Sequence, residues 1–144
     1  GDVARAELQR LVTDLAAAER FYVAALGLRP GRRFGPFAVE LLGLEAPLYL
    51  LANEEGSAPA PGVNTRREYG RHWTPVHLDL AVDALEPAVE RAVAAGAKLE
   101  GGPKEKKWGR IAMLADPFGN GFCLLQFTGL GYDEVAERPR SSRA

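Results

Sequence analysis

The spacing of apolar residues along the chain alternates between the period of a strand and that of a helix. Strand-like stretches at 8–14 and 78–84 each lead into an alanine-rich stretch, at 15–26 and 85–95, whose residues favour a helix. The two copies share a constant offset of 70 residues, which aligns these apolar positions: Leu8, Val12 and Leu15 with Leu78, Val82 and Leu85. The chain therefore contains an internal repeat.

Polar and glycine residues mark the ends of both predicted helices. Asp14 and Asp83 stand at the positions of N-caps, and Glu86 follows Asp83 by three residues, as in a capping box. Gly27 and Gly96 follow the last helical residues, where glycine commonly ends a helix. We therefore expect helices of similar length in the two halves.

Short apolar stretches separated by glycine and proline follow each helix. We expect strands near 28–34, 37–42 and 48–53 in the first half, and near 98–101, 110–115 and 122–128 in the second. The Asp-Pro-Phe-Gly sequence at 116–119 is typical of a turn and should join the last two strands as a hairpin. Each half is thus βαβββ, and the predicted fold class is α+β.

The length of 144 residues, or 15.5 kDa, predicts one domain with two modules. We place module one at about 7–53, a linker rich in glycine and proline at about 54–75, module two at about 76–128 and a tail at 129–144. The linker is long enough to carry function, and Tyr132 is the tail residue expected to dock.

Composition excludes several classes of protein. Hydrophobic residues make up 47% and charged residues 26%, which argues against disorder, and the net charge of −1 gives no general attraction to nucleic acid or anionic membranes. The most apolar stretch, 21–28, falls well short of the roughly 18 residues that suggest a membrane span. One cysteine and no recognisable leader predict a cytoplasmic protein.

Strand periodicity directs a set of polar side chains to the sheet faces that the helices leave open, where we expect a ligand cup. These candidate ligand-binding residues are Glu7, Gln9, Tyr49, Trp73, His77, Asp79 and Cys123. Carboxylate, imidazole and thiolate groups are ligands of zinc and other first-row metals, so Glu7 and His77 are candidate metal ligands and His77 a candidate catalytic residue. Alternatively, these residues have structural roles and bind no ligand or metal. Cys123 is then a small apolar core residue, Tyr49 forms part of the pocket wall and His77 is a hydrogen-bonded structural group.

Basic residues gather in two loops that each contain a tryptophan. The clusters are Arg66, Arg67, Arg71 and His72 beside Trp73, and Lys104, Lys106, Lys107 and Arg110 around Trp108. They could attract a carboxylate or phosphate while a tryptophan stacks on a planar ring, or they could be solvated loop charges. Glu68 and Glu105 interrupt the clusters, which argues against nucleic acid as a partner.

Three segments resemble the vicinal oxygen chelate superfamily of glyoxalase I, bleomycin-resistance proteins and extradiol dioxygenases. They are VTDLAAAERFYVAALGL at 12–28, VHLDLAVDALEPAVERAVAAGA at 76–97 and KWGRIAMLADPFGNGFCLLQF at 107–127. The resemblance implies two βαβββ modules that form a curved mixed sheet around a ligand cup, and paired modules that favour a homodimer. Arg10 departs from the pattern, because an apolar residue is expected on the helix-covered face at this position.

In metal-dependent members of that superfamily, the ligand positions correspond here to Glu7, Tyr49, His77 and Cys123. His77 matches the usual pattern, Glu7 stands where His or Gln is typical, and Tyr49 and Cys123 replace the common Glu. We therefore expect a small-molecule-binding protein for an aromatic or anionic compound, without the usual metal site. The alternative is a lyase, isomerase or dioxygenase that uses a divalent metal such as Zn, Ni, Mn or Fe.

Overall fold

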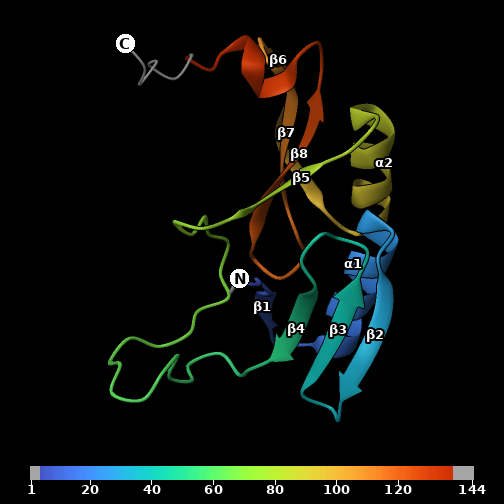
Figure 1. The fold of residues 1–144 in the computed structure, drawn as a ribbon. Helices are drawn as coiled ribbons and strands as arrows, with labels where there is room; N and C mark the ends of the chain where they lie inside the picture. Colours follow the sequence, from blue (N-terminus) through green and yellow to red (C-terminus); the bar gives the residue numbers. More distant parts are fainter. Residues whose placement is uncertain (1–3, 138–144) are drawn as a thin grey trace.

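The computed structural model describes residues 4–137, which form two four-stranded sheets and two main helices (Figure 1). The first module contains β1 (Leu8–Val12), α1 (Leu15–Leu26), β2 (Arg29–Phe34), β3 (Ala38–Leu42) and β4 (Leu48–Ala52). The second contains β5 (Leu78–Ala81), α2 (Leu85–Ala95), β6 (Lys98–Lys106), β7 (Gly109–Ala115) and β8 (Gly121–Phe127), followed by the short 3-10 helix η1 (Gly131–Glu134). The predicted α+β class and the two βαβββ modules are confirmed, whereas the tail predicted at 129–144 lies partly outside the described residues.

The two sheets have the same topology. Their strand orders are β1-β4-β3-β2 and β5-β8-β7-β6, in which the first and last strand of each module pair in parallel and the other pairs are antiparallel. No strand pairing joins the two sheets among residues 4–137. The mixed sheet implied by the resemblance is therefore divided into two halves within one chain.

The ends of α1 follow the sequence prediction, but the beginning of α2 does not. Asp14 Oδ1 accepts a hydrogen bond from the Ala17 amide at 3.0 Å, and Gly27 ends α1 with a left-handed φ of 68°. At α2 the N-cap is Ala84, which makes no side-chain cap, so the prediction of Asp83 as the cap was wrong. The helix begins one residue later, and its Leu85 amide donates instead to Gln126 Oε1 of β8, at 2.8 Å.

Several strand boundaries also differ from the prediction. β1 ends at Val12 and β5 at Ala81, two and three residues before the predicted ends. β6 extends to Lys106, well past the predicted 98–101, because it pairs with β7 through two irregularities of register. Between β4 and β5, the only named pairing in the described chain is an isolated bridge between His72 and Asn120.

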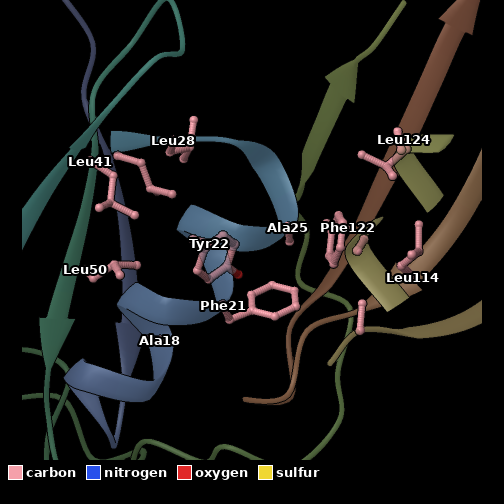
Figure 2. Packing of buried hydrophobic residues seen from close by; sticks show 14 of the residues in the cluster. Ala18, Phe21, Tyr22, Ala25, Leu28, Leu41, Leu50, Leu114, Phe122 and Leu124 are labelled. Atoms are coloured by element: carbon pink, nitrogen blue, oxygen red, sulfur yellow. The ribbon is translucent and has the colours of Figure 1, made fainter. Parts of the chain in front are cut away.

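A single hydrophobic core joins the modules. It contains residues of both sheets and both helices, and α1 packs between the two sheets (Figure 2). In that view Leu41 and Leu50 of the first sheet lie on one side of α1, while Phe21 of α1 points toward Phe122 of β8, with ring centroids 6.4 Å apart. The helix-covered faces of both sheets therefore turn toward a shared core, and their other faces point away from it.

None of the helices in the described part of the chain is long and apolar enough to cross a membrane.

Candidate functional site

The open face of the second sheet brings together three of the predicted site residues. His77 immediately precedes β5, Asp79 lies on β5, and Cys123 is the register partner of Asp79 on β8. His77 Nε2 lies 3.1 Å from Asp79 Oδ1, and the ligand atoms of all three residues lie within 4.8 Å of one another. Partners in register point to the same side of a sheet, so this cluster follows directly from the β5–β8 pairing.

The Cys123 thiol is protonated at neutral pH in this arrangement. Burial raises the pKa of Cys123 to about 11, and the negative charge and hydrogen bond of Asp79 act in the same direction. A thiol in this state is a hydrogen-bond donor and a poor nucleophile. The metal-free cluster therefore provides an imidazole and a carboxylate on the surface, with a neutral thiol behind them.

Trp73 forms one wall beside His77. Its indole meets the His77 ring edge-on with centroids 5.1 Å apart, and the Arg71 guanidinium lies 4.8 Å from the indole centroid. A Cβ at Gly121 would lie 2.4 Å from the Trp73 ring, so the absence of a side chain there allows Trp73 to lie on β8. Trp73 remains 37% exposed, which leaves indole surface for a ligand.

The open face of the first sheet carries a different cluster, centred on Glu40 of β3. Glu40 is only 6% exposed, and its carboxylate accepts hydrogen bonds from Arg32 Nε and NH2 at 3.1 and 2.9 Å and from the Tyr49 hydroxyl at 2.9 Å. These donors, led by the Arg32 side chain, lower the pKa of Glu40 to about 2. The face thus presents three hydrogen-bonded polar side chains, Arg32, Glu40 and Tyr49, whose charges sum to zero.

Sequence reasoning missed Arg32 and Glu40. The available signal was the alternation of β3, in which Val39 and Leu41 are fully buried in the core and Glu40 must point to the open face. A carboxylate at the centre of a strand, with Tyr49 as its register partner on β4, indicates a site or an ion pair.

The remaining predicted residues lie with the first module. Gln9 is the register partner of Tyr49, and Glu7 lies just before β1 in a depression that it shares with Arg5 and Glu45. In the described chain, Glu7 is not part of the group formed by His77, Asp79 and Cys123. The seven predicted residues thus fall into two sets on the open faces of two separate sheets.

One arginine in each of the two basic loops forms ion pairs with acidic side chains. Arg71 forms a bidentate ion pair with Glu100, and Arg110 pairs with both Glu86 and Glu105. Trp108 stacks in a cluster with Phe127 and Tyr132, whose ring centroids lie 5.9 and 5.3 Å from it. Tyr132 therefore docks on the second module, as expected.

Comparison with known proteins identifies the class. Residues 7–125 match the profile of the Glyoxalase-like domain, and the chain belongs to this family. It is 33% identical over 130 residues to the anthracycline biosynthesis protein DnrV of Streptomyces peucetius, an alignment that covers 88% of this chain and 42% of that protein. The chain thus spans less than half the length of this curated relative.

Solved structures of proteins related to glyoxalases and resistance proteins have the same fold as this chain. The fosfomycin resistance protein FosX of Listeria monocytogenes has a TM-score of 0.69 at 14% identity, covering 94% of this chain and all of that one (100%). A glyoxalase/bleomycin resistance protein/dioxygenase family enzyme of Burkholderia phytofirmans has a TM-score of 0.66 at 20% identity, covering 87% and 100%. At these identities the likeness concerns the fold.

Proposed function

We propose that this protein binds a planar aromatic compound with an anionic group, at a site completed by two copies of the chain. The observation that carries the proposal is the open face of the second sheet, where exposed Trp73 stands beside His77 and Asp79. An indole offers a stacking surface, and an imidazole N–H can donate a hydrogen bond to an anionic oxygen. The name of the similar DnrV protein, which refers to anthracycline biosynthesis, points to the same chemical class.

A second copy is needed because one chain does not bring its two open faces together. The shared core lies between the two sheets, so Tyr49 on the first and Cys123 on the second point away from it on separate faces. A two-fold arrangement would place the first sheet of one copy against the second sheet of the other. Phe37, 69% exposed on the first module, and Met113, 39% exposed on the second, are apolar residues that such contact would cover.

Fluorescence titration tests the binding proposal. In a W108F background, Trp73 is the only indole, and anthraquinone-2-carboxylate is a planar anionic probe of the proposed class. We expect the probe to quench Trp73, and H77A to weaken its binding about tenfold while the melting temperature stays close to that of W108F. Y132A is the control, because Tyr132 packs on Phe127 at the end of β8 opposite to Gly121 and Trp73. Equal affinity of H77A and its parent would remove His77 from the site.

A divalent-metal-dependent lyase, isomerase or dioxygenase is the second candidate. The specific observation in its favour is the donor set of His77, Asp79 and Cys123, whose nitrogen, oxygen and sulfur atoms suit zinc and similar metals. A metal held there would act as a Lewis acid on a substrate oxygen. Tyr49 and Glu7 would not complete this set within one chain, since they lie with the first module.

Metal analysis separates the two candidates. Protein purified without chelators or metal-affinity resin should contain well under one metal ion per chain if it is the proposed binding protein. Near-stoichiometric Zn, Ni, Mn or Fe would favour the enzyme. Added Co²⁺ gives a second readout, because a thiolate-to-cobalt charge-transfer band that is absent from C123S would place the ion on Cys123.

A further inference from the structure

A second pocket, which does not include His77, Asp79 or Cys123, lies where β1, the linker between the modules and the β7–β8 turn meet. Its volume is about 420 Å³, within the usual range for small-molecule sites. The side chains that give it its chemistry are Arg10, Arg67, His72 and Asn120 on the polar side, and Leu11 and Val76 on the apolar side. Neither the family match nor the proposed function accounts for this group of residues.

Arg10 is an unusual occupant of its position. Its register partner is Leu50, which is fully buried, so Arg10 also points to the helix-covered side of the first sheet. There its Nε atom is buried and has no hydrogen-bond partner. A buried guanidinium nitrogen without a hydrogen-bond partner lowers the stability of the fold unless another group accepts its hydrogen bond.

Arg67 adds a second unpaired nitrogen to the same pocket. Its NH1 donates to Ser57 Oγ at 2.9 Å and to the Ala58 carbonyl at 2.8 Å, which closes the linker into an ordered loop. Its Nε, like that of Arg10, is buried without a partner. Its NH2 donates to the Pro59 carbonyl at 3.4 Å, so two of its nitrogens hold the arginine in place and the third has no partner.

Hydrogen bonds within the protein also hold His72 and Asn120 in place. The His72 amide donates to the Gly119 carbonyl at 2.8 Å, and His72 Nδ1 lies 2.8 Å from the Gly70 carbonyl, so Nδ1 carries a proton and Nε2 remains for other contacts. Asn120 is 5% exposed, and its side-chain amide donates to Asp116 Oδ2 at 2.9 Å. Two backbone amides also donate to the Asp116 carboxylate, which secures this wall.

We propose that this pocket binds a ligand with an oxyanion, carboxylate or phosphate, on an apolar body. The oxyanion would accept hydrogen bonds from the guanidinium groups of Arg10 and Arg67, which both line the pocket, since guanidinium groups bind carboxylates and phosphates well. The apolar body would contact Leu11 and Val76. Glu68, which also lines the pocket, is exposed to solvent, where water screens its charge.

Benzoate and phenyl phosphate test the proposal, because they share the ring and differ in the oxyanion. At constant ionic strength maintained with chloride, at least one of them should raise the melting temperature of the protein and give a measurable Kd by calorimetry. R10M, which retains much of the side-chain volume and loses the charge, should weaken that probe at least tenfold. H77A should bind it as the unmodified chain does, which separates this site from the proposed binding face.

The result is unambiguous in either direction. The proposal is overturned if neither probe binds more tightly than chloride, or if R10M binds as well as the unmodified chain. Should R10M fail to fold, H72A removes a polar side chain that lines the pocket without altering β1, and it must weaken the same probe. The preferred probe then identifies the natural ligand as a carboxylate or a phosphate.

Discussion

At the scale of single residues, Glu40 shows how a charge is kept inside an otherwise apolar strand. Arg32 and Tyr49 donate to both of its oxygens, and Gly31 leaves room for the carboxylate, since a Cβ there would lie 2.5 Å from Glu40 Oε1. The group is therefore a fixed structural element of the first open face as well as a candidate ligand contact.

This arrangement predicts a specific loss of stability in acid. The folded pKa of Glu40, about 2, lies below its ordinary value of 4.5, so its contribution is complete above pH 4.5 and is lost as the pH falls toward 2. E40Q should therefore have a lower melting temperature at pH 7 and a shallower fall between pH 4.5 and 2. Melting curves across this range check the prediction, with E90Q on the exposed side of α2 as the control for losing one charge. Parallel pH profiles of E40Q and the unmodified chain would contradict it.

At the scale of elements, the two modules repeat their helices but not the way in which the helices begin. α1 uses a local cap, the Asp14 carboxylate on the Ala17 amide. α2 uses a distant one, the Gln126 side chain on the Leu85 amide, 41 positions away in the sequence. The second arrangement ties α2 to β8 and makes the start of the helix depend on tertiary folding.

Three substitutions distinguish these caps. D14A should lower the free energy of unfolding by about 1 kcal/mol, the usual cost of losing an N-cap. Q126A should cost about 1–3 kcal/mol, because Leu85 is buried and its amide would lose its partner. D83A, the matched control at the equivalent position of the repeat, should change stability by less than about 0.5 kcal/mol. Urea unfolding measures all three, and a cost for D83A equal to that of D14A would show that Asp83 does cap α2.

At the scale of the whole molecule, local sequence patterns were sufficient to predict the repeat, but they were not sufficient to predict contacts between distant segments. The apolar spacing predicted both helices and the modular order, and the strand period placed His77, Asp79 and Cys123 on one face. The extension of β6 was missed because Gly101, Gly102 and Pro103 carry no strand signal, although β6 pairs with β7 on both sides of them.

The packing of the modules could not be predicted from either module alone. The apolar stripe of α1 predicts that this helix covers its own sheet, but it does not predict whether a second sheet packs on the other side of the helix. In this structure α1 contacts both sheets. Tyr22 illustrates the point: its ring is buried in the core, while its hydroxyl donates to Asp116 in the turn of the other module. This packing separates the two open faces and leads to the proposal of a two-chain site.

Mixed dimers provide the sharpest test of that proposal. Light scattering should give a mass near twice 15.5 kDa, and Y49A and H77A should each weaken anthraquinone-2-carboxylate binding. In a two-chain site, Tyr49 of one copy faces His77 of the other, so a dimer of Y49A with H77A contains one intact site and one doubly altered site. Unfolding and refolding the two variants together should therefore restore tight binding at about a quarter of the sites, given random pairing. If each site lay within one chain, no site would regain both side chains, and the mixture would bind no better than its parents.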